Sequence, residues 1–149
     1  MGEPSETTRS AESSDLEAQW IVGFTDGEGC FFIGINPHPE MSCGYQILPE
    51  FTIVQHQSDI QILYRIKKFF GCGVIRTNHA DRMAYRVRSI EHLRDKIIPF
   101  FETHTLKTKK NLNFISFRKV VTMISQKEHL SVQGIERIRE IAAKMNRGL

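Results

Sequence analysis

The chain has 149 residues, of which 40% are hydrophobic and 25% charged, a size and composition typical of one domain with a single modest core. Its formal charge is +3, but the first fourteen residues carry three acids and one base, so the rest carries +5. This basic body suits a polyanionic partner without requiring one. The chain has three cysteines and no Cys-x-x-Cys pair, which argues against a disulfide framework. Its histidines are scattered without the spacing of zinc ligands, which argues against a zinc site. It also lacks an apolar run of about 20 residues, which argues against a membrane span.

The N-terminal segment differs in composition from the rest of the chain. Residues 1–13 are rich in Ser, Thr and Glu, which predicts a disordered acidic lead-in rather than a targeting peptide. Residues 14–149 are expected to form a single domain. At its start, Ser14 and Glu17 have the spacing of a capping box, which predicts the beginning of a helix.

The first predicted helix runs into two acids that lie between glycines, Asp26-Gly27-Glu28-Gly29. Gly27 and Gly29 are expected to end it. Carboxylates are disfavoured at a helix C-terminus, where the macrodipole is negative, so the two acids favour a bound divalent cation. Gly23 and Gly27 are four residues apart on one helix face, which would let a second helix approach closely.

Downstream, the hydrophobic period changes from helical to alternating, which indicates an α+β fold. In chain order, we predict strands at 30–37 and 45–55, a helix at 58–70, strands at 72–77 and 85–88, and helices at 89–98, 109–124 and 131–146. Local signals set the boundaries. Ser58 and Gln61 form a possible capping box, Gly71 stops the second helix, residues 78–81 form a polar turn, and Pro99 is expected to end the third helix.

Residues 21–29, Ile-Val-Gly-Phe-Thr-Asp-Gly-Glu-Gly, resemble the LAGLIDADG motif of the homing endonucleases of mobile introns. The motif occurs once, and the order α-β-β-α-β-β-α with an extra C-terminal helix resembles the single-motif half of that family's fold. The resemblance covers roughly residues 16–146 and implies a saddle-shaped antiparallel sheet. Glu28 stands where the family more often has Asp, a conservative departure because both are hard oxygen ligands.

The resemblance also implies a catalytic mechanism, metal-dependent hydrolysis of DNA. Glu28 and Gly27 are expected to bind the metal, normally Mg²⁺, with Mn²⁺ as a substitute and Ca²⁺ supporting binding without efficient cleavage. Gln55 resembles the glutamine that holds an active-site water. Lys109, preferred over its neighbours Lys107 and Lys110, is expected to stabilise charge at the cleaved phosphate. The alternatives are an ordinary amide at a strand end and solvated lysines.

Strand parity and arginine content predict a nucleic-acid-binding face. Phe31, Ile33 and Ile35 fall on one face of the first strand, and Phe32, Gly34, Asn36 and His38 on the other. Arginines on an antiparallel ribbon fit the major groove and can donate bidentately to guanine, although simple solvation is the alternative. The residues expected to contact DNA are Phe32, Asn36, His38, Gln46, Leu48, Glu50, Thr52, Arg76, Asn78, Arg82, Arg86 and Arg88. Arg137 or Arg139 is expected to add a phosphate contact.

A single motif implies a homodimer acting on double-stranded DNA with a long pseudo-palindromic target. The residues expected at the dimer interface are Trp20, Gly23, Phe24 and Gly27. The resemblance implies an organelle, chloroplast or mitochondrion, as the location and origin. An RNA-splicing maturase or a cleavage-dead DNA-binding protein on the same scaffold is the alternative function, and the intact acids favour the enzyme. A nucleotide-binding loop is disfavoured because these glycines follow a helix instead of a strand.

Overall fold

The computed structural model describes residues 15–147. The predicted lead-in at 1–13 and Ser14 of the predicted capping box lie outside these residues, and the domain boundaries stay predictions. The strands are β1 (Gly29–Pro37), β2 (Tyr45–His56), β3 (Val74–His79) and β4 (Arg82–Val87). The α-helices are α2 (Ala18–Glu28), α3 (Ile60–Phe70), α4 (Ile90–His92), α5 (Ile98–Thr103), α6 (Lys110–Ser125) and α7 (Val132–Arg147). None of these helices is long and apolar enough to cross a membrane.

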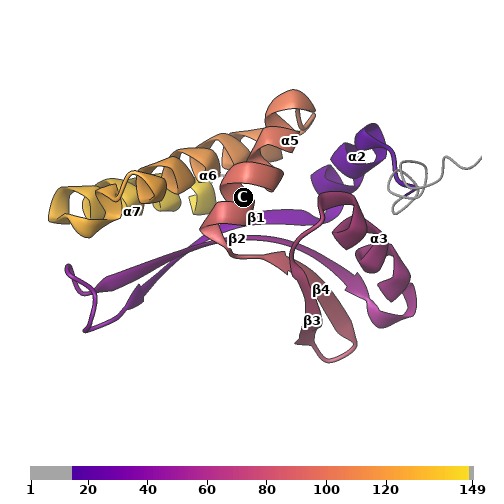
Figure 1. Cartoon of the computed structure of the whole chain (residues 1–149), viewed down its shortest axis with the longest axis horizontal. Coiled ribbons are helices and arrows are strands. Elements are labelled where there is room, and N and C mark those ends of the chain that lie inside the picture. Colours follow the sequence, from indigo (N-terminus) through magenta and orange to yellow (C-terminus); the bar gives the residue numbers. More distant parts are fainter. Residues whose placement is uncertain (1–14, 148–149) are drawn as a thin grey trace, which may run out of the picture.

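The strands form one antiparallel sheet in the order β1-β2-β4-β3, and the helices lie over one of its faces (Figure 1). The α+β class predicted from the sequence is therefore confirmed. β1 and β2 pair along their whole length, from Gly29 opposite Ile53 to Pro37 opposite Tyr45. Because β4 pairs only with residues 51–56 of β2, the outer half of the β1–β2 hairpin is a two-stranded ribbon.

The core lies between the sheet and the helices. Phe31 and Ile33 of β1 and Phe51 and Ile53 of β2 are all at most 6% exposed, whereas Phe32 is 47% exposed. The predicted alternation of β1 is confirmed, since side chains of successive strand residues point to opposite faces. Aromatic rings from the helices complete this core: Phe101, Phe114 and Phe117 pack against Phe31.

Two of the predicted helix starts are wrong. α2 begins at Ala18, with Glu17 as an N-cap that makes no side-chain capping bond. Ser58 does not cap α3: its backbone N–H donates to His56 Nδ1 within a short 3₁₀ turn, η1 (Gln57–Asp59), and α3 begins at Ile60. A Ser, Thr or His side chain at a chain reversal can bond locally instead of capping a helix, and the sequence does not distinguish these outcomes. Gly71 ends α3 as predicted, with φ at 73°.

The third and fourth strands are longer than predicted at the turn between them. β4 begins at Arg82, and the connection contains only Ala80 and Asp81, with Ala80 at a φ of 53°. Asn78, predicted in the turn, lies in β3 at a register shift between Thr77 and His79. The polar side chains of these residues are exposed, so their polarity did not prevent the backbone from pairing.

Pro99 does not end the third helix as predicted. A π-helical turn, η2 (Leu93–Ile97), follows α4, and the Ile98 N–H bonds to Leu93 O. Pro99 then lies in the first turn of α5, where a missing backbone N–H costs little. The other boundaries agree with prediction to within one or two residues, the usual uncertainty of helix and strand ends.

Candidate active site and nucleic-acid interface

The motif helix α2 has one buried and one open side. Ile21, Val22 and Thr25 are at most 1% exposed and pack on the sheet. The predicted interface residues lie on the other side with the helical spacing i, i+3, i+4 and i+7. They are Trp20, Gly23, Phe24 and Gly27.

This open side of α2 is aromatic at one end and free of side chains at the other. The Trp20 and Phe24 rings stack with centroids 4.6 Å apart, and Trp20 is 39% exposed. At Gly23 and Gly27, no described atom other than those of the adjacent residues and of the helix's own backbone lies within 4 Å of the position that a Cβ would take. A second backbone could therefore approach α2 closely along these glycines.

The C-terminal end of α2 is stabilised by a cation from another helix. Lys110, in the first turn of α6, donates from Nζ to the backbone oxygen of Thr25 at 3.1 Å and to that of Gly29. An ammonium group at these carbonyls offsets the negative end of the helix dipole. At Gly29 a Cβ would lie 2.7 Å from Thr25 Cγ2, so the chain requires glycine at this close approach.

Asp26 is bonded within the chain. Its carboxylate accepts hydrogen bonds from the backbone N–H of Lys107 at 2.8 Å and of Thr108 at 3.2 Å, and from the Thr108 hydroxyl at 2.7 Å. Partial burial alone would raise the pKa of Asp26, but these bonds and the nearby Lys110 hold it below its ordinary value. Asp26 therefore joins α2 to the segment entering α6, and its position at a helix end needs no cation.

Glu28 differs from Asp26 in its surroundings. It is exposed, and its carboxylate makes no hydrogen bond or ion pair with any other residue in the range 15–147. A free carboxylate at the end of α2 is a hard oxygen donor of the kind that Mg²⁺ and Ca²⁺ bind. Among residues 15–147, Glu28 belongs to no group of three or more His, Cys, Asp or Glu side chains that could hold a metal ion.

Gln55 lies near the same end of α2. Gly29, the first residue of β1, is opposite Ile53, so Gln55 lies two residues beyond this pair, toward the C-terminal end of α2. It pairs with Met83 and is half-buried on the helix-covered side of the sheet. Of the three candidate lysines, Lys110 is bonded to α2, whereas Lys107 and Lys109 are exposed and their ammonium groups have no partner in the part of the chain that the structure describes.

The face of the sheet opposite the helices collects most of the residues predicted to contact DNA. The cross-strand pairs Phe32–Glu50, Gly34–Leu48, Asn36–Gln46, Thr52–Arg86 and Ala84–Arg76 point the same way. We call these ten residues, with Arg82 and Arg88 at the ends of β4, the open face. In Figure 1 no described helix covers it.

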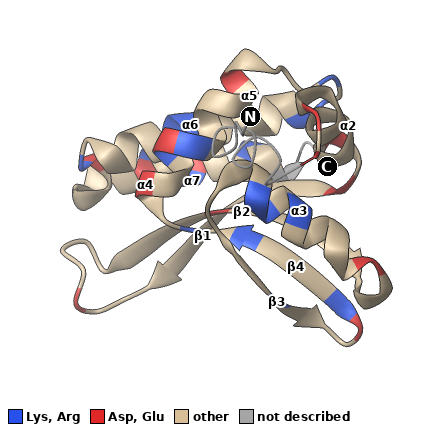
Figure 2. Cartoon of the chain, turned by 45° about the vertical axis from the view of Figure 1, so that its right-hand side comes forward, with Lys and Arg blue, Asp and Glu red and all other residues tan. Residues whose placement is uncertain are grey.

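Cations crowd together on the open face around one acid. Arg88 Nε lies 2.7 Å from Glu50 Oε1. Burial and the neighbouring Arg88 and Arg76 lower the pKa of Arg86, while Glu50 acts in the opposite direction. Figure 2 shows basic residues along β4, with acid at the nearby turn. Because these guanidinium groups repel one another, a bound polyanion would stabilise them.

The remaining predicted contacts lie at the ends of the strands. Arg82 is opposite His56 of β2 and His79 of β3. Asn78 sits at the β3 register shift, so strand parity does not assign it to either face. His38 is in the hairpin loop, and its Nδ1 is buried without a hydrogen-bond partner among residues 15–147.

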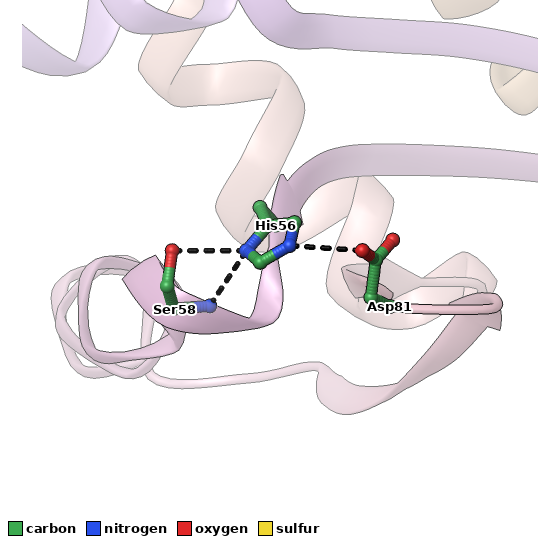
Figure 3. A network of polar contacts seen from close by, with 3 residues as sticks. All are labelled: His56, Ser58 and Asp81. Atoms are coloured by element: carbon green, nitrogen blue, oxygen red, sulfur yellow. Dashed lines mark hydrogen bonds and ion pairs between the residues drawn. The ribbon is translucent and has the colours of Figure 1, made fainter.

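His56, the residue after Gln55, forms a network of polar contacts at the end of the sheet (Figure 3). Its Nδ1 accepts from the Ser58 N–H at 3.0 Å and lies 2.9 Å from Ser58 Oγ, and its Nε2 lies 2.9 Å from Asp81 Oδ2. This bonding assigns the proton to Nε2, which donates to Asp81. The network ties the end of β2 to the β3–β4 turn. Asp81 is 25 residues away in sequence, so no local pattern identifies the pair.

Comparison with known proteins identifies the family. A model of the LAGLIDADG endonuclease family matches residues 21–121, most of the chain. The chain belongs to this family. Among solved structures, that of the homing endonuclease I-TnaI is 53% identical in sequence and similar over 89% of each chain, with a TM-score of 0.86. I-SmaMI, a LAGLIDADG homing endonuclease bound to cleaved DNA, is 31% identical over 86% of this chain and 43% of its own, with a TM-score of 0.84.

Curated relatives are mostly longer than this chain. A probable intron-encoded endonuclease of Neurospora crassa is 31% identical over 90% of this chain and 30% of its own length. The homing endonuclease I-ApeII of Aeropyrum pernix is 27% identical over 76% of this chain and 68% of its own. The chain thus spans about a quarter to a third of the first curated relatives that it matches, 26% and 30% of their lengths. The LAGLIDADG fold predicted from the single motif is confirmed.

Proposed function

We propose that this protein is a site-specific double-strand DNA endonuclease of the intron-homing kind. The observation that carries the proposal is the free carboxylate of Glu28 at the end of α2, beside a sheet whose uncovered face gathers arginines. Similar proteins are named intron-encoded endonucleases, and I-SmaMI is described bound to cleaved DNA. These relatives also support an organelle-encoded origin.

The active unit is a homodimer, with one motif and one half-site per chain. The uncovered side of α2 around Gly23 and Gly27 supports this assembly, because two such helices could pack with their backbones in close contact. A two-fold axis there would bring together two copies of Glu28. It would also place two open faces side by side, as a long pseudo-palindromic target requires.

Gly23→Leu tests the dimer, because a leucine there would separate the two helix backbones. We expect the substitution to shift the protein toward monomer in light scattering, while Lys119→Leu, an exposed position on α6, leaves association unchanged. A wild-type protein that is monomeric at micromolar concentration would contradict the homodimer.

Glu28 fits a divalent cation because its hard carboxylate oxygens are unpaired, and the carbonyl of Gly27 is a second oxygen close by in sequence. We propose Mg²⁺, with Mn²⁺ as a substitute and Ca²⁺ supporting binding without efficient cleavage; I-SmaMI is described with uncleaved DNA in the presence of calcium ions. When bound, such a cation polarises the phosphate and lowers the pKa of a coordinated water.

The chain's own residues then orient the reacting groups. Glu28 fixes the position of the cation. The positive charge of the cation offsets the repulsion between the two Glu28 carboxylates, one from each chain. The Gln55 amide holds the attacking water beside the end of α2. Lys109 donates from its ammonium group to the phosphate oxygens, where negative charge increases during hydrolysis. The open face meanwhile contacts base edges in the flanking major grooves.

Cleavage and binding are measured on the same DNA, drawn from a library of intron-insertion junctions. Glu28→Gln removes the charge and nearly keeps the shape, so cleavage with Mg²⁺ should fall by at least about a hundredfold while gel-shift affinity with Ca²⁺ is kept. Glu28→Asp should retain part of the activity, because both residues supply a carboxylate. Lys107→Ala and Lys109→Ala are compared in parallel.

Two outcomes would overturn parts of the proposal. If Glu28→Gln cuts as fast as the wild type, Glu28 does not bind the metal. If the wild type binds structured intron RNA and never cuts duplex DNA, the protein is a splicing maturase. A protein that binds the duplex and leaves it uncut is a cleavage-dead DNA-binding protein.

A further inference from the structure

The outer half of the β1–β2 hairpin has little support from the sheet itself. Beyond Phe51, which is opposite Val87, β2 has no partner but β1 among the described strands. Two-stranded ribbons are only marginally stable in water and twist strongly. Asn36 and Gln46, which face each other near the tip on the open face, therefore depend on another element for their position.

That element is the C-terminal helical segment, which contacts the back of the ribbon. The Arg139 guanidinium of α7 lies over the Tyr45 ring, 4.4 Å from its centroid. Tyr45 is next to Gln46 in β2, so its side chain points away from the open face. At the loop, Ser42 Oγ and Cys43 Sγ donate to the backbone oxygen of Leu130, at 3.4 and 3.3 Å.

The segment that holds the loop is itself tightly fixed to α7. Leu130 ends a short 3₁₀ turn, η3 (Glu128–Leu130), just before α7. Ser131 Oγ accepts from the Gly134 N–H at 3.0 Å and donates to Glu128 O at 3.3 Å. A Cβ at Gly134 would lie 1.6 Å from Glu128 O, so only glycine allows η3 to pack this closely on the first turn of α7.

We propose that Arg139 is a positioning residue for target specificity. Its contact with Tyr45, together with the η3 contact with the loop, sets the orientation of the hairpin tip, so that Asn36 and Gln46 on the opposite face read the outermost base pairs of each half-site. Arg139 acts through Tyr45 and does not touch the bases. This inference rests on the proposed function, because it requires the open face to bind DNA.

The test compares Arg139→Gln with Arg137→Gln, which removes the same charge from the same helix. Arg137 is exposed and lies on the α6 side of α7, beside Lys119 and Thr122. Each full-length protein selects bound duplexes with Ca²⁺ from a library randomised across both half-sites. For Arg139→Gln we expect preference at the outermost base pairs to fall about two- to fivefold, the factor that corresponds to an exposed cation–π contact. For Arg139→Gln, preference at base pairs near the centre of the target should stay unchanged. For Arg137→Gln, preference should stay unchanged at every position.

Substitutions of Tyr45 separate positioning from loss of charge. Tyr45→Phe keeps the ring face and should keep wild-type preference, while Tyr45→Leu should reproduce the effect of Arg139→Gln. Independently of DNA, backbone amides in the outer half of the hairpin should exchange hydrogen faster in Arg139→Gln, and those of β3 and β4 at the wild-type rate.

Three results overturn an assignment. A uniform, equal loss of affinity in Arg137→Gln and Arg139→Gln makes Arg139 a phosphate contact. Unchanged outer preference and unchanged exchange in Arg139→Gln remove the positioning role. If the wild type selects no duplex at all, the proposed function fails, and the exchange rates alone decide whether α7 fixes the hairpin.

Discussion

The junction between α2 and α6 and the open face of the sheet both contain several charged groups, but these groups have different surroundings in the two regions. At the junction, Asp26 accepts three hydrogen bonds, and Lys110 donates to two carbonyls. On the open face, Arg76 and Arg88 act against the charge of Arg86. Charge that is hydrogen-bonded within the chain stabilises the fold, whereas the crowded guanidinium groups repel one another, and Glu50, which pairs with Arg88, offsets this repulsion only in part. The two acids of the motif also differ: Asp26 is hydrogen-bonded within the chain, whereas Glu28 has no partner among residues 15–147.

The largest stability effect should come from breaking the junction. Asp26→Asn replaces an acceptor of three bonds by an amide with one carbonyl oxygen, so we expect a loss of about 1–3 kcal/mol in the free energy of unfolding. Glu28→Gln, two residues away, should change it by less than about 0.5 kcal/mol because Glu28 has no partner in residues 15–147. Urea denaturation of both variants measures the difference. Equal losses would mean that the two acids have the same role.

The same carboxylate should give the junction an acid limit. The pKa of Asp26 in the folded chain lies below its ordinary value of 3.8, so its stabilising contribution is fully present above pH 3.8. It is lost as the pH falls through the lower folded pKa. The stability gap between wild type and Asp26→Asn, followed by denaturation from pH 7 down to pH 3, should therefore stay constant and then narrow below about pH 4. If the gap instead narrows near neutral pH, its pH dependence comes from a group other than Asp26.

Arg86→Ala probes the open face. Removing one of three mutually repelling cations should leave stability unchanged or slightly raised, while DNA affinity falls and the salt dependence flattens by about 0.9 in the log–log slope if Arg86 neutralises one phosphate. Lost preference at one base pair would instead indicate base readout. Titrations at several salt concentrations measure both, with Lys119→Ala on α6 as the control. No change in either quantity would make Arg86 a solvated surface residue.

The smallest effect concerns two threonines at the junction. Thr25 Oγ1 is buried with no hydrogen-bond partner in the described chain, so Thr25→Val should raise stability by about 0.5–1 kcal/mol. Thr108 donates to Asp26 at 2.7 Å, so Thr108→Val should lower stability by a similar amount. The melting temperatures of the two variants should shift in opposite directions. A shift in the same direction would show that the added methyl group, and not the hydrogen bonding of the hydroxyl, determines the change in stability.

The sequence was informative where one local rule decides the structure. Alternating hydrophobicity assigned Phe31 and Phe32 to opposite faces, and Gly71 stopped a helix because its φ is positive. The single motif identified the family and the fold. Local rules failed at Pro99, where a preceding π turn lets the helix continue, and at Asp26, whose hydrogen-bond donors lie more than eighty residues away in sequence. The catalytic assignments of Glu28, Gln55 and Lys109 stay predictions.

Strict alternation along β1 and β2 has a consequence for how such a protein changes over time. Phe32, Leu48, Glu50 and Thr52 of the open face each lie between two buried residues in sequence, yet none of the four is itself buried. Substitutions at Asn36, Gln46 or Leu48 can therefore accumulate without disturbing Ile33 or Ile47 beneath the sheet. Under the proposed function, target choice and foldability are therefore encoded in interleaved but separate sets of codons, and a lineage could move to a new insertion site by single steps that each leave a folded protein.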